Sequence, residues 1–177
     1  CTFHFQARGD SVDEDILRSL IKANFKYIDF GIETASERLM KLINKQETVS
    51  DNINAVRMAK KLGFQVSATF ILGLPTETKE ERRAAYRLAK ELDIDFARFN
   101  NATPYPGTKL YKIGEEEGTL NIENGWTNLN ACGSLVGGYF DKTRLAYVPR
   151  GTNEKELKRD IFRANVYFYL RPKTIFR

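Results

Sequence analysis

The sequence predicts an α/β fold made of parallel βα units. Apolar runs rich in Phe, Ile, Val and Tyr lie at 2–7, 26–32, 65–72 and 95–102, and such runs are typical of buried strands. A helix-start signal follows the first three runs, and repetition of this kind produces right-handed crossovers and a parallel sheet. Four strands form either a doubly wound sheet or part of a (β/α) barrel. The chain has 177 residues, whereas a complete barrel needs about 250, so it could supply at most about half of one.

Helix starts are predicted from side chains that cap the backbone. A hydroxyl residue followed three positions later by glutamate is a capping box, in which two side chains satisfy free N–H groups. These pairs are Ser11/Glu14, Thr34/Glu37 and Thr78/Glu81, and Thr48/Asp51 begins a further helix in similar style. Residues 152–169 predict a helix that begins at Thr152, whereas 111–150 mix Gly, Asn and aromatics and predict a loop with short elements.

Composition places the chain among ordinary globular proteins. Hydrophobic residues make up 42% and charged residues 29%, close to the average for this class. The longest apolar stretch, around SATFILGL, is too short to span a bilayer, and no signal-peptide pattern begins the chain. Two cysteines, Cys1 and Cys132, cannot form a secreted disulfide framework, so we expect a cytoplasmic location without a membrane partner. The chain enters a strand directly after Cys1, which suggests a piece of a longer protein.

Charge is unevenly distributed along the chain. Residues 1–140 carry 18 basic and 19 acidic side chains, a balance of −1, and residues 141–177 carry 10 basic and 4 acidic ones, a balance of +6. A basic tail can bind nucleic acid or an acidic partner. The cations here are scattered among acids and aromatics, so a solvated helix face is the favoured interpretation and nucleic acid is not an expected partner.

Polar side chains gather where the predicted strands end. They are Gln6, Arg8 and Asp10 after the first strand, Glu33 after the second, Thr69, Gly73 and Glu77 after the third, and Arg98, Asn100 and Asn101 after the fourth. Ligands of parallel α/β folds bind beyond the carboxyl ends of the strands. A glycine such as Gly31 or Gly73 lets a flat group approach the backbone, and a carboxylate such as Glu33 can accept hydrogen bonds from a ribose diol or an ammonium group. Gly31 could instead serve a tight turn and Glu33 the following helix N-terminus, but three such strand ends favour a small-molecule site.

Other catalytic patterns are weak. His4 is the single histidine, so a Ser–His–Asp or Cys–His arrangement has one candidate base, and its apolar strand favours a core side chain instead. Two cysteines 131 positions apart lack metal-ligand spacing. Neither GxGxxG nor GxxxxGKS/T follows a strand, which argues against a nucleotide-binding enzyme of the doubly wound type.

Three segments, in this order and spacing, resemble the second half of a radical SAM catalytic core: FGIETASERLMKLINKQET, ATFILGLPTETKEE and FNNATPYPGTKLY. The resemblance is closest to the subgroup that often carries an upstream cobalamin-binding domain, and FYLRPKTI is similar to the end of its core. It implies α/β architecture as the second half of a partial (β/α) TIM-like barrel, in residues 1–110, with a C-terminal helical extension, residues 111–177, packed on the same domain. It also implies a parent enzyme that reductively cleaves S-adenosylmethionine at a [4Fe–4S] cluster to start radical chemistry, with cobalamin as a candidate second cofactor.

The resemblance implies contacts to the methionine end of S-adenosylmethionine. Gln6 stands where relatives place a polar side chain near the methionine part, and Arg8 follows it on the same strand end. Lys45 matches a basic residue that lies near the carboxylate of S-adenosylmethionine in relatives. A solvated lysine at a helix end is an equally good interpretation of Lys45.

The same resemblance implies contacts to the nucleoside end. Glu33 matches a position that contacts the ribose, and Thr69 stands where some relatives use Asp toward the ribose. Ile71 and Gly73 match the strand edge beside the adenine. No catalytic or metal-ligating residue is assigned.

One departure from the family pattern matters for activity. The CxxxCxxC loop that holds the family's cluster is absent from the sequence, and in the family it lies well upstream of the segments present here. The cluster ligands are therefore expected outside the chain, in a missing N-terminal half, and the chain alone is expected to bind no iron and to be inactive. The alternative is a degenerate α/β module that binds a partner through its basic tail without catalysis.

Overall fold

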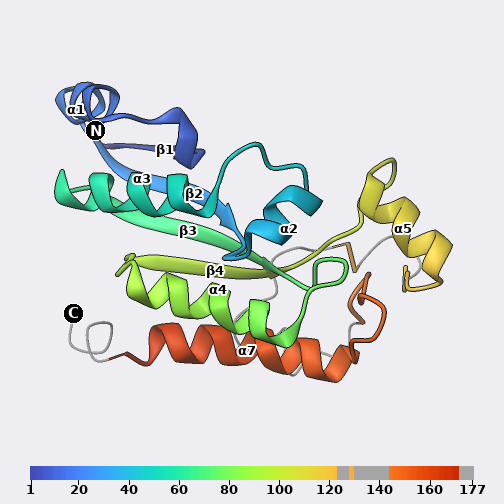
Figure 1. Ribbon diagram of the computed structural model, residues 1–177. Coiled ribbons are helices and arrows are strands. Elements are labelled where there is room, and N and C mark those ends of the chain that lie inside the picture. The colour runs from blue at the N-terminus through green and yellow to red at the C-terminus, as the bar shows by residue number, and fades with distance from the viewer. Residues whose placement is uncertain (123–127, 130–143, 172–177) are drawn as a thin grey trace. The chain divides into compact units, whose positions relative to one another are not determined.

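The computed structural model describes residues 1–122, 128–129 and 144–171 (Figure 1). The chain divides into two compact units. The first comprises Cys1–Phe70 with Arg83–Arg98, and the second comprises Ile71–Arg82 with Phe99–Arg177. The division into 1–110 and 111–177 stays a prediction.

Four strands form one sheet, and they follow each other in the order β1-β2-β3-β4. Their bounds are β1 Phe3–Ala7, β2 Phe25–Glu33, β3 Gln65–Leu72 and β4 Phe96–Asn101. β1 pairs with β2, and β2 with β3, in parallel. The predicted fold class of parallel βα units is confirmed, and each strand lies within one residue of its predicted bounds at either end.

The two faces of the sheet differ in polarity because side chains alternate along each strand. Ile28, Phe30, Val66 and Ala68 are completely buried on one face. Helix α3 (Val49–Lys61) packs on β2 (Figure 1) and buries Ala55, Val56 and Ala59. The other face is more polar, and it carries Gln6, Asp29, Ser67, Thr69 and Arg98.

His4 lies on the polar face of the edge strand β1 and is exposed. The interpretation of His4 as a core histidine is therefore wrong. An edge strand has a neighbouring strand on one side only, so its side chains are less covered than those of the central strands.

Four helices of the chain begin close to the predicted positions, with two corrections to their caps. Helices α3 and α4 (Lys79–Glu91) confirm the capping boxes of Thr48/Asp51 and Thr78/Glu81. Helix α1 (Glu14–Lys22) is capped by Asp13 and not by Ser11, whose hydroxyl donates to the Arg8 carbonyl in the 3₁₀ helix η1 (Gly9–Ser11). Helix α2 (Glu37–Leu42) is capped by Ser36. Thr34 Oγ1 instead accepts a hydrogen bond from the Ser36 amide.

The second unit contains helices α5 (Lys109–Glu117) and α7 (Glu154–Tyr169). Helix α7 buries Leu157, Ala164 and Phe168. Its cap is Asn153 rather than the predicted Thr152, and its described end agrees with the predicted one. Helix α5 lies largely within a segment predicted to be a loop with short elements. Among the described residues, no helix is long and apolar enough to cross a membrane.

Candidate functional site

A pocket of about 540 Å³ lies at the ends of β1, β2 and β3, within the first unit. Five of the residues predicted from the sequence line it: Gln6, Arg8, Glu33, Lys45 and Thr69. The pocket is open to solvent, and its volume lies within the range of small-molecule sites, which is about 300–1,000 Å³. The structure therefore brings these five side chains together, although their individual roles stay predictions.

A buried carboxylate forms the floor of this pocket. The sheet register places Asp29 of β2 between Gln6 of β1 and Ser67 of β3. Asp29 accepts hydrogen bonds from Gln6 Nε2 at 3.3 Å and Ser67 Oγ at 2.8 Å, and it forms an ion pair with Arg98 of β4. Arg98 also donates through Nε to Thr69 Oγ1 at 3.2 Å. Asp29 thus links side chains of β1, β3 and β4 into one hydrogen-bonded group before any ligand arrives.

Glu33 reaches the pocket through an irregularity of β2. The register shifts between Gly31 and Glu33, where β2 has one more residue than β3 opposite. Glu33 itself has a φ of 64°, in the left-handed region that favours glycine. A bulge of this kind re-aims a side chain and is over-represented beside functional sites. Such a backbone costs of order 1 kcal/mol and persists only where the surroundings hold it.

Lys45 connects Glu33 to the loop that follows α2. Its ammonium group donates to the Gly31 carbonyl and lies 3.2 Å from Glu33 Oε1 and 3.0 Å from Glu47 Oε1. The Lys45 side chain is 13% exposed, so its charge is held mainly by these three oxygens.

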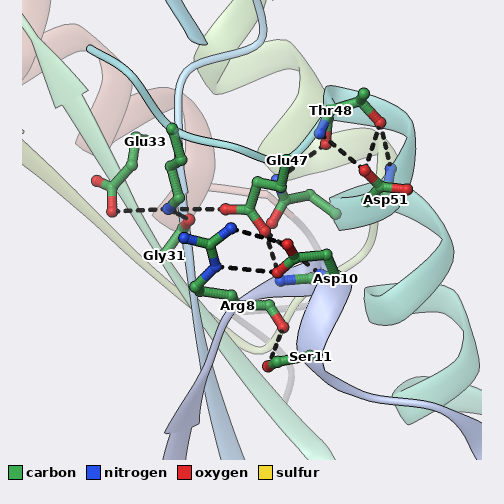
Figure 2. Close-up of polar contacts among 11 residues, drawn as sticks. Arg8, Asp10, Ser11, Gly31, Glu33, Glu47, Thr48 and Asp51 are labelled. Carbon is green, nitrogen blue, oxygen red and sulfur yellow. Dashed lines mark hydrogen bonds and ion pairs between the residues drawn. The ribbon is translucent and has the colours of Figure 1, made fainter. Parts of the chain in front are cut away.

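Glu47 extends the same network to the end of β1. Its buried carboxylate accepts hydrogen bonds from the amides of Gly9 at 2.8 Å and Asp10 at 3.4 Å. Arg8 and Asp10 are joined by two hydrogen bonds of 2.9 and 2.7 Å (Figure 2), and the bond from Arg8 lowers the pKa of the Asp10 carboxyl. The turn after β1 is thereby tied to the turn after β2.

The charges around the pocket do not cancel. Described side chains that line the pocket or contact its lining include three cations, Arg8, Lys45 and Arg98, and four carboxylates, Asp10, Asp29, Glu33 and Glu47. Their formal sum is −1. A site with this balance favours a ligand that carries net positive charge.

Ile71 and Gly73, the other two predicted residues, belong to the second unit. Gly73 has a φ of +83°, and its amide donates to Glu77 Oε2 at 2.5 Å. A Cβ on Gly73 would lie 2.7 Å from Leu157 Cδ2. The turn conformation and the contact with Leu157 thus require glycine at this position, whatever its role toward adenine.

Glu77 belongs to a buried ion cluster, which we name the Arg82 cluster and define as Glu77, Arg82, Glu156 and Asp160. Arg82 donates through Nε to Asp160 at 3.0 Å, and its other nitrogens lie 3.9 Å from Glu77 and 3.6 Å from Glu156. Burial raises the pKa of Glu77 to about 7, and the Gly73 amide and Arg82 oppose that rise. The cluster ties the turn after β3 to helix α7.

The titration of Glu77 predicts a pH-dependent stability of the fold. The ordinary pKa of its carboxyl is 4.5, and in the folded chain the pKa is about 7, so folding takes up a proton between these two pH values. The contribution of the Glu77 carboxyl to the free energy of unfolding is therefore full below about pH 4.5 and is lost as the pH rises through 7. We expect the free energy of unfolding to fall by about 3 kcal/mol more in the wild type than in Glu77→Gln across this range.

Urea unfolding at pH 5 and pH 8 measures this difference. Glu80→Gln, which changes an exposed carboxylate of α4, is the matched control and should follow the wild type. An equal pH dependence in the wild type and Glu77→Gln would contradict the prediction.

The described residues contain no group of three or more His, Cys, Asp or Glu side chains that could hold a metal ion. Cys1 is exposed and not in a disulfide. Cys132 lies outside the described residues. The described part of the chain thus has no donor set that fits an iron–sulfur cluster, which is normally held by several cysteine thiolates.

Parallel βα units with a polar pocket at the strand ends define a protein of the α/β class. Residues 1–89 match the radical SAM superfamily. The chain belongs to this superfamily, as its sequence motifs predict.

Curated relatives agree with that assignment. An uncharacterized methyltransferase of Pyrococcus horikoshii, PH0819, is 32% identical over 97% of this chain and 35% of its own length. The anaerobic magnesium-protoporphyrin IX monomethyl ester cyclase of Cereibacter sphaeroides is 34% identical over 56% of this chain and 16% of its own length. The chain therefore spans about a third or less of the length of these relatives.

Solved structures show the same fold at low sequence identity. Coproporphyrinogen III oxidase (HemN) from Escherichia coli, described as a radical SAM enzyme, has a TM-score of 0.62 at 16% identity, over 95% of this chain and 32% of its own. The radical S-adenosylmethionine methyltransferase TsrM from Kitasatospora setae has a TM-score of 0.62 at 18% identity, over 96% of this chain and 36% of its own.

Proposed function

We propose that this chain supplies the S-adenosylmethionine site of a radical SAM enzyme, and that polypeptide outside the chain supplies the ligands of the [4Fe–4S] cluster. The observation that carries the proposal is the pocket at the ends of β1, β2 and β3, with Glu33 at its rim. Family membership indicates the cofactor, and the described residues provide a site that fits it. The enzyme is placed in the cytoplasm, with cobalamin as a candidate second cofactor because the motifs resemble the subgroup that often carries a cobalamin-binding domain.

Charge supports S-adenosylmethionine as the ligand. Its sulfonium, ammonium and carboxylate groups sum to +1, and the side chains that line the pocket together with their ion-pair partners sum to −1. A nucleoside triphosphate, with several negative charges, would meet two carboxylates in the lining, Asp29 and Glu33. The charge balance therefore favours the sulfonium cofactor over a phosphorylated nucleotide.

Glu33 is the side chain best placed to accept hydrogen bonds from a ribose diol. One of its oxygens, Oε1, contacts Lys45, and the other, Oε2, carries no hydrogen bond among the described residues (Figure 2). The side chain is 20% exposed, so this oxygen can reach a ligand in the pocket. Hydrogen bonds to a charged acceptor are stronger than neutral ones.

Gln6, Arg8 and Thr69 complete the proposed cofactor contacts in this pocket. Gln6 is held by its hydrogen bond to Asp29, and Arg8 has a half-exposed side chain, so both side chains lie at the end of β1 where the methionine part is proposed to bind. When bound beside a reduced cluster, S-adenosylmethionine supplies the radical chemistry, and this chain's residues bind and orient it.

Glu33→Gln tests the proposed site. The experiment uses the longest protein that contains this chain, loaded anaerobically with iron and sulfide, and measures the Kd for S-adenosylhomocysteine by calorimetry. We expect binding to weaken about tenfold, since a neutral amide replaces a charged acceptor of the diol. Glu91→Gln, an exposed carboxylate of the same unit, should leave the Kd unchanged.

The same preparations test where the cluster is held. The longer protein should bind close to four irons per chain, whereas the 177-residue chain treated alike should bind none. Iron bound by the short chain in that amount would contradict the proposal. An unchanged Kd in Glu33→Gln would contradict the role of Glu33, and no binding of S-adenosylhomocysteine by the iron-loaded protein would favour a partner-binding module without catalysis.

A further inference from the structure

The backbone after α2 directs Lys45 back toward the strand ends. Asn44 has a φ of 55°, in the left-handed region, and the amide of Lys45 donates to the Met40 carbonyl at 3.0 Å. This turn closes helix α2 and leads the chain across the end of β2. Lys45 therefore approaches Gly31 from a loop, 14 positions further along the sequence.

The ammonium group of Lys45 is engaged by oxygens of the chain itself. A lysine ammonium carries three N–H donors. Three oxygens surround it: the Gly31 carbonyl, Glu33 Oε1 and Glu47 Oε1 (Figure 2). The ammonium group donates to the Gly31 carbonyl and to Glu33 Oε1, and it forms an ion pair with Glu47 Oε1, which accepts no hydrogen bond. A ligand carboxylate would have to compete with two carboxylates of the chain for this cation. The geometry thus gives Lys45 a different role from the ligand contact that the family resemblance implies.

Gly31 is part of the same arrangement. A Cβ at this position would lie 2.7 Å from Glu33 Oε1 and 3.1 Å from Lys45 Nζ. A side chain there would occupy the space through which Lys45 reaches the Gly31 carbonyl. The glycine at the end of β2 therefore makes room for the chain's own lysine and carboxylate.

We propose that Lys45 is a positioning residue for the cofactor's ribose: it fixes the Glu33 carboxylate and neutralises Glu47, so that Oε2 of Glu33 stays directed at the ribose diol. The inference rests on the proposed function, since Glu33 must meet a diol for its orientation to matter. Without the cation, two carboxylates would face each other near the pocket, and Glu33 would turn away toward solvent.

Two variants separate positioning from folding. Lys45→Met alone leaves Glu47 charged, buried and without its cation, which can destabilise the fold. Lys45→Met combined with Glu47→Gln removes that buried charge as well, yet Glu33 still lacks the ammonium group that holds its carboxylate. The matched control is Lys41→Met, which changes an exposed lysine in the last turn of α2 in the same way.

The readout is the affinity for two probes, S-adenosylhomocysteine and its 2′,3′-dideoxy counterpart, measured on the iron-loaded protein. We expect the double variant to bind S-adenosylhomocysteine about fivefold more weakly and to bind the dideoxy probe with an unchanged Kd. Lys41→Met should bind both probes as the wild type does. A loss confined to the diol-bearing probe is not expected of a residue that only supports the fold.

Each other outcome overturns a distinct claim. Equal weakening for both probes in the double variant, or loss of fold in both Lys45 variants, would assign Lys45 to stability alone and overturn the inference. A diol preference that Glu33→Gln abolishes and the double variant retains would also overturn it, while leaving the proposed function in place. A wild-type protein that binds both probes equally would overturn the role of Glu33 in the proposed function, and this inference with it.

Discussion

Replacing Arg82 by methionine should destabilise the fold by about 3–5 kcal/mol, because the buried carboxylates of the Arg82 cluster would lose their cation. Arg82 has a side chain that is 3% exposed, and it lies 3.0 Å from Asp160. Water cannot replace the guanidinium at such a site without opening it. Urea unfolding at pH 8, where Glu77 carries most of its charge, measures the loss.

Arg83→Met is the matched control for this prediction. Arg83 neighbours Arg82 in α4 but is exposed, so its replacement should change the free energy of unfolding by less than about 0.5 kcal/mol. A combined Arg82→Met and Asp160→Asn variant removes one of the unpaired charges and should recover part of the loss. A cost of less than about 1 kcal/mol for Arg82→Met would show that the cluster contributes little net stability, as some buried ion pairs do.

Replacing Gly73 by alanine should cost about 2–4 kcal/mol for two separate reasons. A φ of +83° is strained for any side chain, at about 1 kcal/mol or more. The new Cβ would also lie 2.7 Å from Leu157 Cδ2, and forcing extra volume into a packed core costs about 1–3 kcal/mol.

Gly63→Ala separates the two contributions. Gly63 has a φ of +89°, and a Cβ there would meet nothing within 4 Å, so this variant should show the backbone cost alone. Leu157→Val in the Gly73→Ala background should recover part of the packing cost. Equal destabilisation by Gly63→Ala and Gly73→Ala, measured by urea unfolding, would show that Leu157 moves aside freely.

The strands could be predicted from the sequence because their alternation is strong and their ends are marked by glycine or charge. The helix caps were harder to place, since neighbouring residues compete for the same amides. Ser11 and Thr34 have the expected spacing to a glutamate, yet Asp13 and Ser36 stand nearer to the helices and cap them. Local pattern identifies a helix start but does not decide between two capping side chains a residue or two apart.

The sequence prediction gives helix α5 no bounds, because its sequence, KLYKIGEEE, is short and carries its apolar side chains only in the first five residues. Its ends did carry signals. Thr108 caps the start, and Gly118 ends the helix with a φ of 65°. A hydroxyl cap and a left-handed glycine ten positions later are the usual boundaries of a short helix.

Part of the site could be predicted, because the positions of its strand-end residues follow from the topology of a parallel sheet. Gln6, Glu33 and Thr69 follow from the rule that ligands meet the carboxyl ends of parallel strands. Asp29 and Glu47 do not follow from it. Asp29 lies inside a strand, and its importance depends on the register that places Gln6 and Ser67 beside it. Glu47 reaches Gly9 across 38 positions of chain, a contact that only the folded loop after α2 creates.

The Arg82 cluster also sets an order of events during synthesis. Arg82 and Asp160 are 78 positions apart in the chain. At roughly 5–20 residues per second, the ribosome takes about 4–16 seconds to add that length. Throughout this interval the turn after β3 exists without its partner on α7, and Arg82 must stay in contact with water. We therefore expect the first unit to acquire its fold while the chain is still being made, and the turn after β3 to become fixed only once α7 has left the ribosome.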